Sequence, residues 1–118
     1  MKLNGSATMI RVHFGEDDRW HGKPLYDAIV EEARRQDLAG ATVYRGIEGY
    51  GASSRIHRTH WLMSSDLPIM VSIVDEPEKI QRFLPTLESM VREGLITISD
   101  VEVIRYTHRE ASSENGGV

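Results

Sequence analysis

Apolar and polar residues alternate along four segments of the chain, and such alternation predicts β-strands that bury one face. The four segments are residues 9–14, 41–47, 67–74 and 101–106. In the first three strands, the sides expected to be buried carry Ile10, Val12 and Phe14, then Val43 and Ile47, then Ile69, Val71 and Ile73.

Between these strands, two segments carry apolar residues at the three- and four-residue spacing of an amphipathic helix. Their stripes are Leu25, Ala28, Ile29 and Ala33 in the first, and Ile80, Phe83, Leu84, Leu87 and Val91 in the second. The first helix is expected to begin after Pro24 and to stop at Gly40, where glycine accepts left-handed backbone. The second is expected to be capped by Asp75 and to end at Gly94, with a kink at Pro85 because proline interrupts helical hydrogen bonding.

The resulting order of strand, helix, strand, strand, helix, strand is that of the ferredoxin-like split motif. The sequence therefore predicts an α+β fold, βαββαβ, whose four-stranded antiparallel sheet carries both helices on one face. The face without helices is expected to mix Met9, Met70, Val74 and Ile104 with Arg11, His13 and Ser72. A partly apolar face predicts burial against another copy of the chain, and an ordinary exposed face is the alternative.

Composition narrows the class of protein. With 118 residues, 40% of them hydrophobic and 27% charged, the chain has the size and make-up of one globular domain. We expect this domain at residues 7–108 and a flexible tail at residues 109–118. The net charge of -4 argues against nucleic acid as the main partner, and the absence of cysteine excludes disulfides and thiolate chemistry. No signal-peptide pattern and no apolar run of roughly 20 residues is present, so we expect a cytoplasmic protein that does not insert into membranes.

The segment that follows the second strand holds the richest candidate chemistry. Residues 48–65 have no helical period, and a connection of this length inside one domain is usually functional. A candidate phosphate site spans its beginning, where glycine backbone amides, hydroxyls and guanidinium groups suit an anion. The candidate ligand-binding residues are Arg45, Gly46, Gly49, Gly51, Ser53, Ser54, Arg55 and Arg58. The alternative is a glycine-rich hairpin with solvated arginines, because neither a Walker A loop nor a dinucleotide motif is present.

Other residue types suggest weaker chemistry. His57 and His60, joined by His13 or His21, provide nitrogen ligands without the spacing of a metal site. The carboxylates of residues 16–18 suit Mg²⁺ or a neighbouring arginine, but a solvated loop is the favoured interpretation. No spacing forms a catalytic triad or an acid–base pair, so we predict that the chain is not an enzyme and requires no cofactor.

Three blocks of the sequence are similar to the PII-like family known as domain of unknown function 190. They are GEDDRWHGKPLYDAIVEEAR at residues 15–34, DLAGATVYRGIEGYGASSRIH at residues 37–57 and LPIMVSIVDEPEKIQRFLP at residues 67–85. The resemblance extends over residues 9–106. More distantly, GATV followed by GYG resembles the strand that leads into the T-loop of PII nitrogen-signalling proteins.

The resemblance implies a homotrimer with a nucleotide site between subunits, where ATP, ADP or AMP is the expected ligand. It also implies that the loop at residues 48–65 contacts a target protein such as a membrane transporter or channel. The glycine-rich basic loop of PII proteins is absent from the matching place, residues 91–98. A divalent-metal tolerance trimer of the same fold and an adaptor trimer without a small ligand are the alternative functions.

Overall fold

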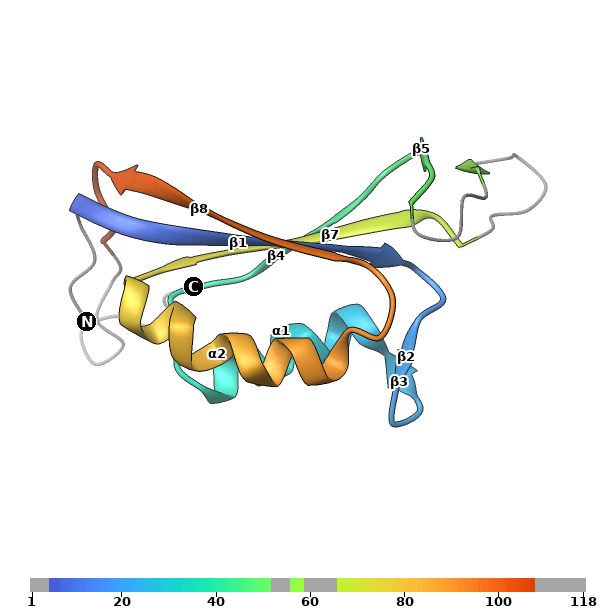
Figure 1. Ribbon diagram of the computed structural model, residues 1–118, viewed down its shortest axis with the longest axis horizontal. Helices are drawn as coiled ribbons and strands as arrows, with labels where there is room; N and C mark the ends of the chain where they lie inside the picture. The colour runs from blue at the N-terminus through green and yellow to red at the C-terminus, as the bar shows by residue number, and fades with distance from the viewer. Residues whose placement is uncertain (1–4, 52–55, 59–65, 108–118) are drawn as a thin grey trace, which may run out of the picture.

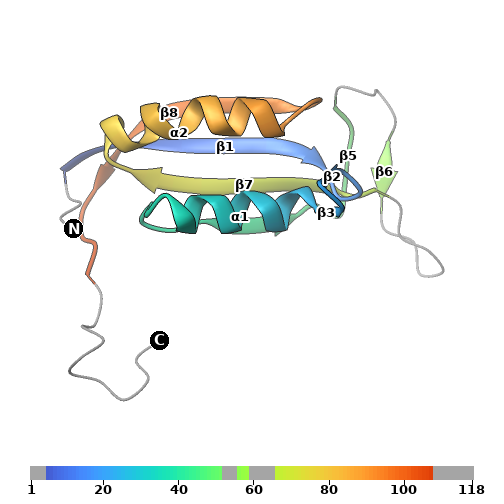
Figure 2. The same cartoon turned by 90° about the horizontal axis from the view of Figure 1, so that it is seen from below.

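Two helices lie side by side on one face of a four-stranded antiparallel sheet (Figures 1 and 2). The computed structural model describes residues 5–51, 56–58 and 66–107. In chain order the elements are β1 (Gly5–Gly15), β2 (Arg19–Trp20), β3 (Lys23–Pro24), α1 (Leu25–Arg35), β4 (Thr42–Arg45), β5 (Glu48–Gly49), β6 (His57–Arg58), β7 (Pro68–Asp75), α2 (Pro77–Met90) and β8 (Leu95–Val103). The predicted ferredoxin-like fold is confirmed.

The sheet has the strand order β4-β7-β1-β8, so β1 and β7 are central and β4 and β8 form the edges. Strand β1 pairs antiparallel with β7, with Val12 opposite Val71, and with β8, with Val12 opposite Ile96. Strand β4 pairs with β7 over only four residues. Helix α1 lies in the connection from β1 to β4, and α2 lies in the connection from β7 to β8. Both connections place their helix against the same face of the sheet.

The core lies between this face and the helices. Most of the side chains that alternation and helical spacing predicted to be buried are buried: Ile10, Val12, Phe14, Ile69, Val71 and Ile73 from the sheet, and Leu25, Ala28, Ile29, Ala33, Ile80, Phe83 and Leu87 from the helices. Val43, Leu84 and Val91 are only partly buried against this core. The prediction for Ile47 was wrong, because this residue lies beyond the end of β4 and is 80% exposed. Met90 also joins this core. Burial of these side chains is the main favourable contribution to folding.

The ends of both helices and the last strand differ from the prediction. Helix α1 ends at Arg35 and is followed by Gln36 as its C-cap, so the predicted stop at Gly40 was wrong. Helix α2 ends at Met90, and β8 runs over Leu95–Val103 rather than over residues 101–106. An added Cβ at Gly94 would meet the backbone oxygen of His13 in β1, so this residue allows a close approach to β1 just before β8 instead of ending a helix. Pairing with β1, which lies far away in the sequence, decides where the last strand lies. The kink at Pro85, inside α2, remains a prediction.

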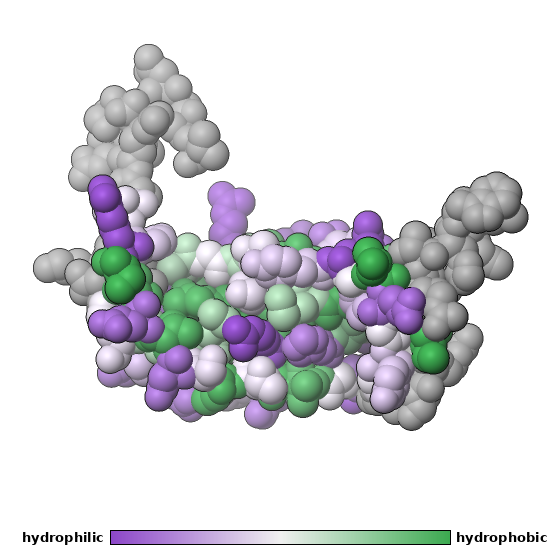
Figure 3. All heavy atoms as spheres, turned by 90° about the horizontal axis from the view of Figure 1, so that it is seen from above, coloured by the Kyte–Doolittle hydropathy of each residue, from purple (hydrophilic) through white to green (hydrophobic). Residues whose placement is uncertain are grey.

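The expected place of Ile104 in the helix-free face was therefore wrong. Ile104 follows β8 and its side chain is 85% exposed. The other predicted members of this face lie together, because Met9 is opposite Val74 and His13 is opposite Met70. Figure 3 shows apolar side chains on this face interspersed with polar ones.

The predicted cap of α2 was also wrong. Pro77 is the first helical residue, Glu76 precedes it, and no side chain caps the helix. Asp75 is instead the last residue of β7 and is fully buried. Its carboxylate accepts backbone N–H groups from Glu76 at 2.6 Å and from Ala39 at 2.8 Å. This carboxylate therefore joins the α1–β4 connection to the β7–α2 junction.

Two short hairpins occur in segments expected to be loops. Strands β2 and β3 pair after β1, and in the turn between them His21 has a left-handed φ of 49° with its ring stacked on that of Trp20. Strands β5 and β6 pair within the long segment at residues 48–65. The expected tail at residues 109–118 lies outside the described residues. None of the described helices is long and apolar enough to cross a membrane.

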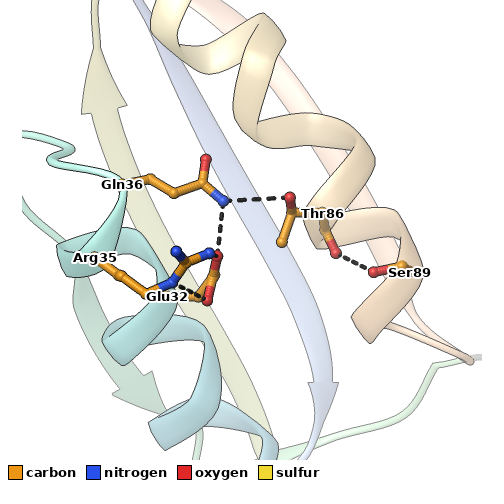
Figure 4. Close-up of polar contacts among 5 residues, drawn as sticks. All are labelled: Glu32, Arg35, Gln36, Thr86 and Ser89. Atoms are coloured by element: carbon orange, nitrogen blue, oxygen red, sulfur yellow. Dashed lines mark hydrogen bonds and ion pairs between the residues drawn. The ribbon is translucent and has the colours of Figure 1, made fainter.

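A polar cluster joins the exposed sides of the two helices (Figure 4). The amide of Gln36 donates to Glu32 in α1 at 2.8 Å and to Thr86 in α2 at 3.3 Å. The guanidinium of Arg35 also donates to Glu32, and these two donors lower the pKa of that carboxyl. The cluster thus adds a polar contact between the two helices to their packing in the apolar core.

Candidate functional site

The described part of the chain has a hollow of about 600 Å³ at the end of the sheet where β1 ends and β7 and β8 begin. Five segments meet there: the end of β1, the turn before β2, the hairpin strand β5 with the glycines after it, the start of β7, and the connection into β8. The lining residues are His13, Phe14, Gly15, Asp18, Glu48, Gly49, Tyr50, Gly51, Asp66, Pro68, Glu93, Gly94 and Leu95.

Four of these residues are carboxylates: Asp18, Glu48, Asp66 and Glu93. No lysine or arginine of the described residues lines the hollow, and the imidazole of His13 is the one basic ring that does. The described side chains that line the hollow are therefore mainly acidic. This lining favours hydrogen-bond donors and positive charge over a phosphate group.

Hydrogen bonds hold the turn at residues 16–18, which follows β1 and carries three carboxylates. The backbone N–H of Asp17 donates to a carboxylate oxygen of Asp66 at 2.7 Å, and the N–H of Glu16 donates to the carbonyl of Leu67 at 2.8 Å. An added Cβ at Gly15 would lie 2.5 Å from that Asp66 oxygen, so only glycine fits without displacing the carboxylate. The turn after β1 is thereby pinned to the segment that leads into β7.

The pKa of Asp18 is raised. Burial is the largest cause, a hydrogen bond with the Gly15 backbone opposes it, and repulsion from Asp66, Glu93 and Asp17 adds to it. These neighbours belong to three different segments of the chain. The pKa of Asp18 is thus raised mainly by burial, and the carboxylates that the fold brings to this hollow add to the shift.

Replacing Asp18 by asparagine should stabilise the protein at neutral pH. The folded state binds the proton of the Asp18 carboxyl more tightly than the unfolded chain does. The native protein therefore loses part of its free energy of unfolding as pH rises from the ordinary aspartate range through the raised pKa of Asp18. The Asp18→Asn variant lacks this loss. Urea unfolding at pH 4 and pH 7 should show a smaller difference between the two pH values than the native chain shows.

The neighbouring Asp17→Asn variant is the matched control, because Asp17 is exposed. It should follow the native pH dependence more closely. A native-like pH dependence in Asp18→Asn would mean that the carboxylate is not desolvated in the folded protein.

The ligand residues predicted from the sequence fall into three groups: residues that line the hollow, described residues that do not line it, and residues whose side chains are not described. Gly49 and Gly51 line the hollow. Arg45 does not; its guanidinium forms an ion pair with Glu16 at 2.5 Å, and its side chain remains 55% exposed. Gly46 packs against β7, where its N–H donates to the carbonyl of Pro68 at 2.7 Å. Ser53, Ser54 and Arg55 lie outside the described residues, and only the backbone of Arg58, in β6, is described.

Sequence reasoning missed Glu48, Asp66 and Glu93 as site residues. They lie far apart in the sequence and follow no ligand spacing, so no local signal marks them. The carboxylate run at residues 16–18 was singled out. Its members separate, however, since Asp18 lines the hollow and Glu16 pairs with Arg45.

The histidines of the metal hypothesis do not come together in the described part of the chain. His13 lines the hollow, whereas His21 lies in the β2–β3 turn beside a second hollow between the helices, of about 550 Å³. The side chain of His57 and all of His60 lie outside the described parts. Among the described residues no group of three or more histidine, aspartate or glutamate side chains is arranged to hold a metal ion.

Comparison with known proteins assigns the family. The model of DUF190, described as an uncharacterized ACR, matches residues 7–103. A UPF0166 protein of Aquifex aeolicus is 46% identical over 98 residues, which cover 81% of this chain and 91% of the relative. A UPF0166 protein of Methanocaldococcus jannaschii is 34% identical over 100 residues, covering 84% of this chain and 93% of the relative.

Solved structures support the fold at much lower sequence identity. CPII from Thiomonas intermedia K12, a nitrogen regulatory PII-like protein bound to ADP, AMP and bicarbonate, has a TM-score of 0.58 and 16% identity. The alignment covers 85% of this chain and 90% of CPII. The divalent ion tolerance protein CutA1 from Ehrlichia chaffeensis has a TM-score of 0.56 and 8% identity over 90% of this chain and 88% of its own. The family resemblance stated from the sequence is confirmed, and the chain belongs to the DUF190 family.

Proposed function

We propose that this chain is a PII-like regulatory protein that binds an adenine nucleotide in clefts between the subunits of a homotrimer. The observation that carries the proposal is that Gly49, Tyr50 and Gly51 form one wall of a hollow large enough for a nucleotide base. The fold shared with CPII, which was solved with ADP and AMP, adds support. The protein acts by binding rather than by a chemical step.

The charge of the hollow orients the proposed ligand. Its carboxylates repel phosphate, but they can accept hydrogen bonds from the exocyclic amine of adenine or from ribose hydroxyls. Tyr50, whose side chain is 74% exposed, offers a ring on which the base can stack. The phosphates then point away from the hollow, and Arg45 is the proposed partner for them; Arg55 and Arg58, which lie outside the described side chains, remain candidate partners by residue type alone.

The helix-free face of the sheet is the proposed contact between subunits. Met9, Met70 and Val74 are half-buried on it, and Tyr44 and Leu95 remain 49% and 56% exposed. Closing these side chains against sister copies would remove their apolar surface from water. It would also bring the ends of the sheets together, which creates the clefts.

The segment at residues 48–65 is the proposed contact with a target protein, such as a transporter or channel. Its first residues belong to the wall of the hollow, so a ligand there contacts the same backbone that leads into the segment. A bound nucleotide can shift this segment between two states only as far as its affinities for the two states differ. Such a shift would change how well the segment fits a target.

Calorimetric titration of the full chain with ATP, ADP and AMP tests the proposal. At least one should bind with a Kd below 1 mM. Because a hydrogen bond to a charged group contributes about 1.5–3 kcal/mol, Arg45→Ala should weaken binding about 10- to 100-fold. Arg34→Ala, which removes an exposed charge from the last turn of α1, should leave the affinity unchanged. Millimolar or weaker binding of all three nucleotides would remove the ligand from the proposal.

A further inference from the structure

The carboxyl of Asp18 is held at the hollow by the backbone of its own turn. The N–H of Asp18 donates to the carbonyl of Gly15 at 3.1 Å, and the Asp18 carbonyl accepts the N–H of Leu25, the first residue of α1, at 2.8 Å. The residue is half-buried and lines the hollow together with Tyr50. These two bonds tie Asp18 to the end of β1 and to the start of α1, so the fold fixes the backbone from which its carboxyl reaches the hollow.

The groups around this carboxyl favour its protonated form. The other acidic groups are Glu48 on β5, Asp66 before β7, Glu93 before β8 and the exposed neighbour Asp17. Burial is the largest cause of the raised pKa of Asp18, a hydrogen bond with the Gly15 backbone opposes it, and repulsion from Asp66, Glu93 and Asp17 adds to it. A proton on Asp18 therefore costs less free energy than a proton on an exposed aspartate.

Cations of the adjoining elements do not offset this repulsion. Among the described residues, His13 is the basic side chain that lines the hollow, and Arg19, Arg45 and Arg92 do not line it. The guanidinium of Arg45 pairs instead with the carboxylate of Glu16. Within the described part of the chain, Asp18 thus meets mainly acidic groups.

The other carboxyls of the hollow are less suited to act as neutral acids. One oxygen of Asp66 already accepts the backbone N–H of Asp17 at 2.7 Å, an arrangement that favours the ionised form. Glu48 and Glu93 are exposed, where water stabilises a charged carboxylate. Among these lining carboxyls, Asp18 is therefore the one best placed to act in its protonated form.

Protonation changes which nucleobase a carboxyl can bind. A neutral carboxylic acid has an O–H donor and a C=O acceptor side by side, whereas an ionised carboxylate only accepts. The Watson–Crick edge of adenine offers the complementary pair, because its N1 accepts and its 6-amino group donates. The same edge of guanine presents two donors, the N1–H and the 2-amino group, and these suit an ionised carboxylate.

We propose that Asp18 selects the base of the bound nucleotide, and that it binds adenine as a neutral acid whose O–H donates to N1 and whose carbonyl oxygen accepts from the 6-amino group. The inference rests on the proposed function and names the residue that recognises the base. A carboxylic acid kept neutral in a partly apolar site is an effective hydrogen-bond donor. Adenine binding then takes up as much as one proton from solvent, whereas guanine binding takes up none.

The affinity for an adenine nucleotide should therefore depend on pH. In the free protein Asp18 ionises as pH rises through its raised pKa, so above this range adenine binding must first restore the proton. The affinity for AMP should fall by up to about tenfold for each further pH unit, which is the slope of one proton. GMP carries the same phosphate group, so the ratio of the two affinities cancels the titration of the phosphate.

Calorimetric titration of the full chain with AMP and GMP between about pH 6.5 and pH 8 tests the assignment. The ratio of AMP affinity to GMP affinity should fall by about threefold or more over this range. AMP binding should also take up protons, measured in buffers of different ionisation enthalpy. Asp18→Asn should remove both effects and still bind AMP at pH 8 at least as tightly as the native chain, because the asparagine amide offers a donor and an acceptor at every pH.

Two variants are the matched controls. Asp17→Asn changes the exposed neighbour, and it should keep most of the native pH dependence. His13→Gln should keep it as well, although it removes the imidazole of the lining, a group that gains a proton roughly between pH 5 and 8.

Three results would overturn the role of Asp18: an affinity ratio that does not change with pH in the native chain, a native-like pH dependence in Asp18→Asn, or its loss in His13→Gln. If AMP binds and one of these results is found, the proposed function stands and only the role of Asp18 fails. If no nucleotide binds, the proposed function fails and this inference fails with it.

Discussion

Replacing Phe83 by alanine should lower the free energy of unfolding by about 3–5 kcal/mol, the usual range for truncating a buried aromatic side chain. Phe83 is fully buried in the core between α2 and the sheet. Truncation removes its apolar contacts and leaves a cavity that the surrounding side chains cannot fill without moving. Urea unfolding monitored by circular dichroism at fixed protein concentration measures the effect.

The control for this variant is Arg82→Ala, at the preceding position of the same helix. Arg82 is exposed, so its truncation should change the unfolding free energy by less than about 0.5 kcal/mol. A loss below about 1 kcal/mol in Phe83→Ala would show that α2 does not pack on the sheet through this residue. Since assembly also stabilises the fold, both variants need comparison at the same concentration.

Replacing Asp75 by alanine should have the second-largest effect, a loss of about 2–4 kcal/mol. The change removes the acceptor for the backbone N–H groups of Ala39 and Glu76, and each unsatisfied buried donor costs about 1–3 kcal/mol. It also removes the partner of Lys79, whose ammonium lies 3.5 Å from the Asp75 carboxylate. Amide hydrogen exchange should show the largest loss of protection in the α1–β4 connection.

Asp37→Asn separates this effect from a general loss of negative charge. The Asp37 side chain is 96% exposed and lies 3.9 Å from the same Lys79 ammonium. Asparagine accepts the positive φ of 63° found at this position, so no backbone strain is added. Its unfolding free energy should stay within about 0.5 kcal/mol of the native value. Equal losses in the two variants would contradict a specific role for the buried carboxylate.

The candidate site was only partly predictable. The glycine-rich stretch after β4 suggested a binding wall, and Gly49 and Gly51 do line the hollow. The acidic character of the hollow was not predicted, because Asp18, Asp66 and Glu93 come from three separate connections. Arg45 was expected to face a ligand, and within one copy it pairs with Glu16 instead. Such contacts depend on the packing of remote segments.

Element boundaries failed where tertiary contacts outweigh local signals. Asp75 has the sequence context of a helix cap, but its carboxylate is used to join the α1–β4 connection to the end of β7. Gly94 has the context of a helix end, but its lack of a side chain serves the close approach to the His13 carbonyl. In both cases the residue type is suited to more than one role.

The sequence by itself determined the order of the main elements and the faces that they bury. Periods of 2 and 3.6 residues express strand and helix geometry directly, and burial of the matching apolar side chains dominates folding. Only the tertiary structure decided the course of β8 along β1, the role of Asp75 and the acidic lining of the hollow. These features arise from contacts between residues far apart in the chain, for which local periodicity carries no information.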